Sequence, residues 1–189
     1  MVVLNRIWTG TGDDGSSALI SGERRPKFDL RIDAYGSVDE TNAVVGLARI
    51  HTSGMVDLDA ALARIQNDLF DLGADLANPE TAEQKVEPLR IVDTQVTRLE
   101  GEIDALTHRL PPLRSFVLPG GTVAAAHLHH ARVVARRAER LMFALAQREP
   151  IGRPALRYIN RLSDFLFVAA RSANDMGARD VLWVPGAGR

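Results

Sequence analysis

The sequence predicts an all-α protein, a single up-and-down five-helix bundle with a long glycine-rich loop at the N-terminus. Five segments carry apolar residues at the three- and four-residue spacing of an amphipathic helix, and these segments are bounded by proline or glycine. At 189 residues, the chain is long enough for one domain with a sizeable core. We therefore expect residues 1–189 to form a single domain.

Residues 1–36 are rich in glycine, proline and charge, and they have no helical period. We expect them to form an ordered or ligand-ordered loop with room for one short strand. The first helix is expected to begin at Ser37, because Ser37 and Glu40 match a capping box, in which the two residues satisfy each other's backbone amides. It is expected to run to about Thr52 and to stop at Gly54.

Two longer apolar repeats predict the second and third helices. The second starts near Asp57 and ends where Asn78 precedes Pro79, and the third follows Pro88. Alternating spacings of three and four over about three heptads favour near-parallel helix packing. The apolar residues of these repeats are Leu58, Leu62, Ile65, Leu69, Leu72 and Leu76 in the second helix, and Leu89, Val92, Val96, Leu99, Ile103 and Leu106 in the third.

The fourth helix is predicted over residues 123–147, with Thr122 as its N-cap after a proline–glycine–glycine turn. The fifth helix begins after Pro154 and runs to about Asn174, and the tail, residues 177–189, is expected to be partly mobile. The apolar stripe of the fourth helix consists of Ala124, Leu128, Ala131, Ala135, Ala138, Met142 and Leu145.

Composition excludes several classes of protein. Charged residues make up 25% and the formal net charge is -1, so no overall field favours nucleic acid or a membrane surface as a partner. The absence of cysteine excludes a disulfide framework and thiolate metal sites, and it fits a reducing compartment. The start of the chain lacks a signal-peptide core, and no stretch approaches the ~20 apolar residues that span a bilayer. We therefore expect a cytoplasmic protein.

Three arginines, Arg132, Arg136 and Arg140, lie four residues apart in the fourth helix. This spacing places their guanidinium groups along one side of the helix, away from its apolar stripe. Like charges at this spacing destabilise a helix by roughly 0.2–0.5 kcal/mol per pair. The column therefore needs solvent or an anion, and the helix alone leaves both interpretations open.

The segment from Gly10 to Gly15 matches G-x-G-x-x-G. It does not fit a dinucleotide fingerprint, because no βαβ unit follows it, and it does not fit a kinase loop, because no HRD or DFG element is present. Glycines can still expose backbone N–H groups as an anion-binding nest, and a flexible surface turn is the alternative. Farther along, His127 is expected to tilt toward the apolar stripe and His129 toward the arginines, so we predict no metal site there.

Three segments together resemble the trimeric, PduO-like family of ATP:cob(I)alamin adenosyltransferases. They are TGTGDDGSSALISGERRPK followed by RIDAYGSVDETNAVVGLAR, then FVLPGGTVAAAHLHHARVVARRAER, and then YINRLSDFLFVAARSAN. The resemblance implies a homotrimer whose active sites lie between subunits, with ATP held by the N-terminal loop (residues 1–36) of one subunit and the arginine helix of the next.

The resemblance also implies roles for individual residues. Arg132 would pair with Asp39 across the subunit boundary, Phe116 would lie on the lower axial face of the corrin, and Arg136 would act on the phosphates. The remaining ATP contacts would be Thr9, Gly10, Thr11, Gly12, Ser17, Lys27, Arg137, Ala138, Glu139, Arg140 and Asn160. Outside this resemblance, ordinary core packing is the alternative for Phe116.

The implied reaction explains why these residues would be needed. Cobalt(I) of cob(I)alamin attacks C5′ of ATP and expels triphosphate, a polyanion that fixed cations and Mg²⁺ would stabilise. We expect Mg²⁺ to enter with ATP, and we name no protein ligand for it. A reductase for cob(II)alamin and a B12-dependent mutase that receives the product are the implied partners. A non-catalytic delivery protein and a nucleotide-sensing bundle without chemistry remain the alternatives.

Overall fold

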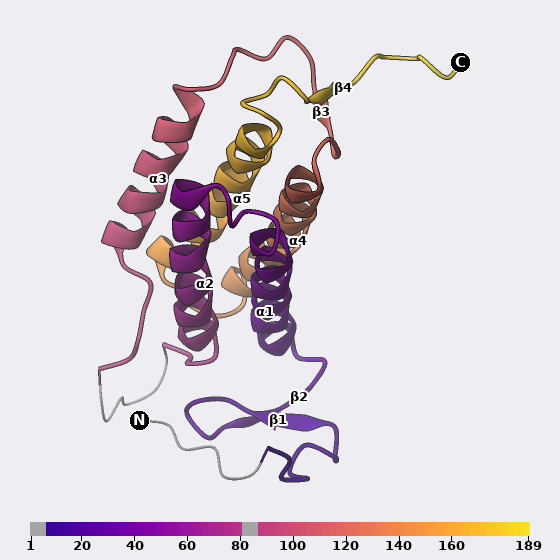
Figure 1. Cartoon of the computed structure of the whole chain (residues 1–189). Helices are drawn as coiled ribbons and strands as arrows, with labels where there is room; N and C mark the ends of the chain where they lie inside the picture. The colour runs from indigo at the N-terminus through magenta and orange to yellow at the C-terminus, as the bar shows by residue number, and fades with distance from the viewer. Residues whose placement is uncertain (1–6, 81–86) are drawn as a thin grey trace.

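The computed structural model describes residues 7–80 and 87–189. Its helices alternate in direction along one bundle axis (Figure 1), so the up-and-down five-helix bundle predicted from the sequence is confirmed. The helices are α1 (Leu30–Arg49), α2 (Val56–Leu76), α3 (Asp93–Thr107), α4 (Val123–Ala146) and α5 (Arg153–Ala173), and the strands are β1 (Ser16–Ala18), β2 (Arg24–Pro26), β3 (Val117–Leu118) and β4 (Val181–Leu182).

The core forms where the predicted apolar stripes face one another. Helix α1 packs against α2 and α4, and α5 packs against α3 and α4. The core also contains polar groups. For example, the hydroxyl of buried Tyr158 donates to Oδ2 of Asp68 at 2.7 Å. The fully buried members of the stripes include Leu62, Leu72, Leu99, Leu128, Met142 and Leu162.

The start of α1 differs from the prediction. The helix begins at Leu30, and the side chain of Asp29 is its N-cap, accepting from the backbone N–H of Arg31 at 2.8 Å. Ser37 is buried within the helix, so its match to a capping box with Glu40 is coincidental. The pattern misleads because a serine and a glutamate three apart also fit the helix interior once an earlier residue supplies the cap.

Two other boundaries also move. The segment before α1 forms a two-stranded hairpin, in which β1 and β2 pair antiparallel with Ser17 opposite Arg25, rather than one short strand. Helix α3 begins at Asp93 rather than directly after Pro88. The predicted cap of α4 is confirmed, because Oγ1 of Thr122 accepts a hydrogen bond from the backbone N–H of Ala125.

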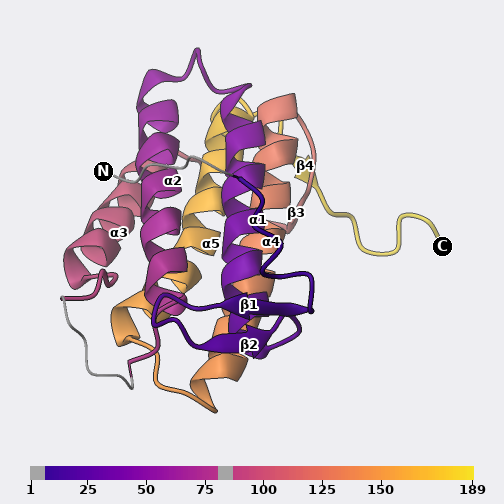
Figure 2. The same cartoon turned by 90° about the horizontal axis from the view of Figure 1, so that it is seen from below.

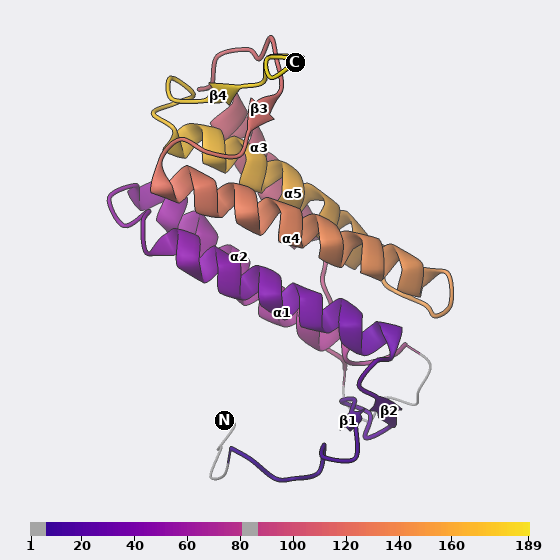
Figure 3. The same ribbon diagram turned by 90° about the vertical axis from the view of Figure 1, so that its right-hand side faces the viewer.

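The two small sheets lie at opposite ends of the bundle. Figure 2 shows the β1–β2 hairpin across the ends of α1 and α4, whereas β3 and β4 pair at the far end (Figures 1 and 3). The 24 residues of α4 correspond to about 36 Å of helix, so the two sheets are well separated. Within residues 7–80 and 87–189, no helix is long and apolar enough to cross a membrane.

Candidate active site

Helix α4 carries three cations without an ion-pair partner among the described residues. Arg136 and Arg140 are exposed, and Nη1 of Arg140 donates to the carbonyl oxygen of Arg136 at 3.1 Å. Arg132 is partly buried, and its Nε has no hydrogen-bond partner in the described part of the chain. Burial lowers the pKa of Arg132, and the charge of Arg136 lowers it further. These guanidinium groups remain available to an anion.

Arg137 and Ala138 have different surroundings on the same helix. Arg137 forms an ion pair with Glu40 of α1, so its charge is engaged within the chain. Ala138 is wholly buried. Its side chain packs in the core, which leaves only its backbone for a contact with ATP.

Hydrogen bonds through Asn160 connect three helices. Its Nδ2 donates to Oε1 of Glu139 in α4 at 2.7 Å, and its Oδ1 accepts from Nη1 of Arg161 at 2.5 Å. Nε of Arg161 donates in turn to Oε1 of Glu100 in α3 at 2.9 Å. The structure thus brings the predicted Glu139 and Asn160 together. Sequence reasoning missed the contact of Arg161 with Glu100, because it joins helices that are distant in the chain.

Asp39 and Arg132 form no ion pair among the described residues of the chain. Asp39 is exposed on α1, and the ion pair that joins α1 to α4 is instead the one between Glu40 and Arg137. The pairing of Asp39 with Arg132 therefore stays a prediction about an assembly of several copies.

Turns and one arginine organise the glycine-rich loop. Gly10 and Gly15 have φ values of 73° and 81°, in the region that favours glycine. The hydroxyl oxygens of Thr9 and Thr11 are 2.9 Å apart. The guanidinium of Arg24 donates to the carbonyl oxygen of Thr11, a contact that the sequence pattern did not signal. The predicted threonines and glycines are thus held in one ordered loop.

The ammonium group of Lys27 lies against this loop. A Cβ added to Gly12 would lie 3.2 Å from Nζ of Lys27 and 3.3 Å from the carbonyl oxygen of Ser16, so a larger side chain would crowd the ammonium. The backbone N–H of Lys27 donates to the carbonyl oxygen of Gly15 at 2.8 Å, and Ser17 lies in β1. One hairpin therefore carries the predicted Gly12, Ser17 and Lys27.

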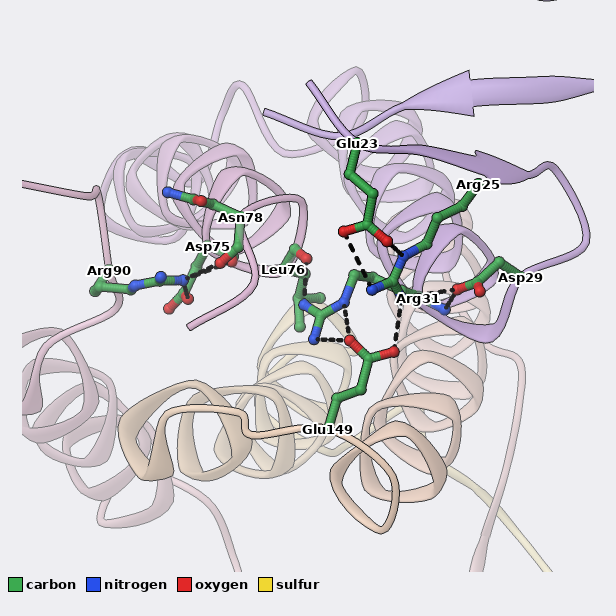
Figure 4. A network of polar contacts seen from close by, with 9 residues as sticks. All are labelled: Glu23, Arg25, Asp29, Arg31, Asp75, Leu76, Asn78, Arg90 and Glu149. Atoms are coloured by element: carbon green, nitrogen blue, oxygen red, sulfur yellow. Dashed lines mark hydrogen bonds and ion pairs between the residues drawn. The ribbon is translucent and has the colours of Figure 1, made fainter. Parts of the chain in front are cut away.

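A polar network attaches this hairpin to the bundle (Figure 4). Oε2 of Glu149, in the loop between α4 and α5, accepts from Nε and Nη2 of Arg31 at 3.0 and 2.9 Å. Its Oε1 accepts from Nη1 of Arg25 at 2.6 Å. Hydrogen bonds from Arg25 and then Arg31 hold the pKa of Glu149 below its ordinary value, against desolvation, which raises it. Sequence reasoning missed this network.

Phe116 lies at the opposite end of the bundle and is 76% exposed, so the alternative of ordinary core packing is wrong. Its ring meets Trp183 edge to face, with centroids 5.8 Å apart. The backbone N–H of Trp183 donates to the carbonyl oxygen of Phe116 at 2.8 Å. The tail thus supports the loop that carries Phe116, a role that its Gly- and Pro-containing sequence did not signal.

The predicted orientations of His127 and His129 are wrong. His129 is 1% exposed, and neither ring nitrogen has a partner among the described residues, whereas His127 stacks on His51 with centroids 5.4 Å apart. The prediction ignored the packing of α5, where Phe167 lies against His129. Among the described residues, no group of three His, Cys, Asp or Glu side chains could hold a metal ion.

Comparison with known proteins decides the family. The sequence profile of the family described as cobalamin adenosyltransferase matches residues 7–173. A corrinoid adenosyltransferase of Mycobacterium tuberculosis strain H37Rv is 48% identical over 100% of this chain and 97% of the relative. The chain belongs to the cobalamin adenosyltransferase family. A corrinoid adenosyltransferase of Bacillus subtilis is 45% identical over 89% of this chain and 86% of the relative.

Solved cobalamin adenosyltransferase structures have the same fold. A phenylalanine-to-alanine variant of the PduO-type ATP:corrinoid adenosyltransferase from Lactobacillus reuteri, complexed with cobalamin and ATP, has a TM-score of 0.86 and 39% identity, and the match covers 94% of this chain and 99% of that chain. An arginine-to-lysine variant of that enzyme, complexed with ATP, has a TM-score of 0.87 and 40% identity, covering 95% and 100%. The five-helix bundle is therefore the fold of PduO-type adenosyltransferases, and the resemblance found in the sequence is confirmed.

Proposed function

We propose that this protein transfers the 5′-deoxyadenosyl group of ATP to the cobalt of cob(I)alamin, releasing triphosphate, at sites between the subunits of a homotrimer. Adenosyl transfer from ATP to cobalamin is the activity of the family to which the chain belongs. The observation that carries the proposed site is the set of unpaired guanidinium groups on α4, those of Arg132, Arg136 and Arg140. A triphosphate is an anion that matches them.

The separation of the site residues supports a site shared between subunits. Within one chain, the β1–β2 hairpin lies at one end of the bundle and β3, which directly follows Phe116, lies at the other (Figure 1). Among the described residues, no hydrogen bond or ion pair joins the loop of residues 9–27 to the arginines of α4. In Figure 3, residues 7–15 run outside the helices. We infer that the loop of one copy completes the α4 site of another.

The reaction requires strong stabilisation of its leaving group. The cobalt–carbon bond forms as the bond from C5′ to the triphosphate oxygen breaks, and that electron pair leaves with the triphosphate. Lys27 and the α4 arginines would bind this polyanion through charge-assisted hydrogen bonds. Thr9, Ser17 and the backbone of Gly10–Gly12 would bind it as neutral donors, and Glu139 with Asn160 would complete the nucleotide pocket.

Magnesium would enter with the nucleotide. Mg²⁺ in nucleotide sites is typically held by substrate phosphates and water with few protein ligands. When bound, Mg²⁺ would neutralise part of the triphosphate charge, and the arginines would supply the rest.

Phe116 would lie against the lower axial face of the corrin. Its exposed ring offers no lone pair to cobalt, and it would exclude water and the dimethylbenzimidazole base. A four-coordinate cob(II)alamin accepts an electron more easily, which eases formation of cobalt(I). A reductase that supplies this electron and a B12-dependent mutase that receives the product stay predictions.

The direct test supplies chemically reduced cobalamin and Mg-ATP to the purified protein. We expect the absorption spectrum of adenosylcobalamin and one triphosphate released per adenosyl group. Tight binding of added adenosylcobalamin without turnover would favour the delivery alternative. ATP binding without affinity for cobalamin would favour the nucleotide-sensing alternative.

Mixed oligomers test whether the site is shared. Arg136→Ala and Lys27→Ala should each be nearly inactive alone, because each lacks one half of every site. After unfolding and refolding together in equal amounts, activity should recover to on the order of a quarter of wild type, because one interface in four pairs two intact halves. No recovery in trimers shown to be mixed would place both residues in one subunit's site.

A further inference from the structure

We propose that Arg25 is a positioning residue for ATP binding. It fixes the β1–β2 hairpin to the bundle through Glu149, so that Ser17 and Lys27 are held where the nucleotide binds. This inference rests on the proposed function, because it concerns how the ATP loop is held. It predicts a specific loss of ATP affinity from a residue that does not itself contact the substrate.

The first observation is that one carboxylate is divided between two arginines. Among the described residues, Oε2 of Glu149 accepts only from Arg31, a residue of α1 that is 2% exposed, whereas Oε1 accepts from Arg25 of β2. Arg31 also donates to the carbonyl oxygen of Leu76 at 2.6 Å, which fixes it to the end of α2. Glu149 is therefore held by buried structure on one side and presents its other oxygen to the hairpin (Figure 4).

The second observation is the position of Arg25 within the hairpin. Ser17 lies directly opposite Arg25 in the β ladder, so both side chains are on the same face of the hairpin. Lys27 follows Arg25 by two residues, and its ammonium lies against Gly12. A shift of Arg25 therefore moves Ser17, Lys27 and the glycine-rich loop together.

Among the described residues, the other attachments of the hairpin lie near its turn and where β2 leads into α1. Leu19 is buried, and the backbone N–H of Ile20 donates to the carbonyl oxygen of Ala77 at 3.0 Å. These contacts lie next to β1, on the opposite side of Ser17 from the glycine-rich loop. At the end of β2, the backbone N–H of Asp29, the N-cap of α1, donates to the carbonyl oxygen of Pro26 at 2.8 Å. Without Arg25, we expect the hairpin to stay folded and to move about these two attachments, neither of which includes Ser17 or the glycine-rich loop.

The test compares Arg25→Gln with Arg64→Gln. Arg25→Gln leaves the pair of Arg31 and Glu149 intact, so the bundle should fold. Arg64 pairs with Glu102 between α2 and α3, so its replacement removes the same charge at a position away from the loop.

For Arg25→Gln, we expect the KM for ATP to rise about tenfold, the effect of one charge-assisted hydrogen bond. The kcat and the KM for cobalamin should stay within about twofold of wild type, and amide hydrogen exchange should accelerate in residues 9–27 alone.

Two further variants separate positioning from a general loss of structure. Arg25→Lys keeps the charge and should recover part of the ATP affinity. Adding Glu149→Gln to Arg25→Gln should raise the KM for ATP no further, because both changes remove one contact. If Glu149→Gln does not fold, Arg25→Gln with its control still decides the question.

Two results would overturn the inference. One is a KM for ATP in Arg25→Gln equal to that in Arg64→Gln, and the other is an equal rise in the KM values of both substrates. Absence of adenosylcobalamin formation by the wild-type protein would instead contradict the proposed function. The two failures are therefore distinguishable.

Discussion

The two arginine-rich regions of this molecule differ in their partners. At one end of the bundle, Arg25 and Arg31 share the carboxylate of Glu149, and Arg31 is almost wholly buried. On α4, Arg136 and Arg140 are exposed and have no acidic partner among the described residues. The first set joins elements of the fold, whereas the second repels itself and favours an anion. The presence of a carboxylate partner, rather than the arginine itself, distinguishes a structural cation from one that remains available to a ligand.

The largest expected effect is on stability, at the paired region. Glu149→Ala leaves Arg31 buried without its carboxylate, and we expect the free energy of unfolding to fall by about 3 kcal/mol. Chemical denaturation measures this change. Glu102→Ala, which breaks the more exposed pair with Arg64, should cost less than about 1 kcal/mol. Equal losses in the two variants would contradict the structural role of the Glu149 network.

The unpaired region should respond in the opposite way. Arg136→Ala removes a charge-assisted contact to phosphate, so kcat/KM for ATP should fall by an amount equivalent to about 1.5–3 kcal/mol. Its free energy of unfolding should stay the same or rise by roughly 0.2–0.5 kcal/mol, because a repulsive pair is lost. Steady-state kinetics and denaturation of the same sample measure both. Wild-type kinetics, or a large loss of stability, would break the contrast between the two regions.

A smaller effect is expected at the predicted subunit boundary. Asp39→Asn keeps the shape of an exposed side chain but removes the charge proposed to pair with Arg132 of another copy. We expect kcat/KM to fall by the equivalent of about 1 kcal/mol, with little change in the unfolding of the helices. Kinetics together with a molecular-mass measurement test this expectation. Unchanged turnover in a trimeric Asp39→Asn protein would show that activity does not depend on a pair between Asp39 and Arg132.

The smallest expected effect is the pH dependence of the paired region. The folded pKa of Glu149 lies below its ordinary value of 4.5 because Arg25 and Arg31 donate to it. Its contribution to stability is therefore complete above the ordinary value and is lost as pH falls through the folded pKa. The difference in unfolding free energy between wild type and Glu149→Gln should shrink as pH decreases from 6 to about 3. A difference that is constant over this range would show that the charge of Glu149 does not stabilise the fold.

Much of the fold could be predicted from the sequence, because apolar periodicity reports directly on which helix face is buried. The stripe of α4 from Ala124 to Leu145 and the cap at Thr122 are local patterns, and both were predicted correctly. The start of α1 was wrong because Ser37 and Glu40 satisfy a local pattern that Asp29 fulfils in the structure. A local pattern of this kind does not show which of two candidate residues caps the helix.

The candidate site could likewise be predicted only in part from the sequence. The spacing of the arginines predicted a column on one side of α4, away from its apolar stripe, since helical geometry is local. The acceptor of Arg25 could not be predicted, because Glu149 lies 124 residues away in the chain. The edge contact of Trp183 with Phe116 likewise depends on the pairing of β3 with β4. Partners across the fold decide which arginines are paired, and sequence patterns do not contain them.

A crystal structure of the protein with Mg-ATP and cobalamin tests the central claim most directly. We expect triphosphate oxygens at about 2.7–2.9 Å from the guanidinium nitrogens of Arg136 and Arg140 in one subunit, with Lys27 of another copy on the same phosphates. Arg25 and Arg31 should remain bound to Glu149. Phosphates bound elsewhere, or α4 arginines that point into solvent while the nucleotide is present, would contradict the account.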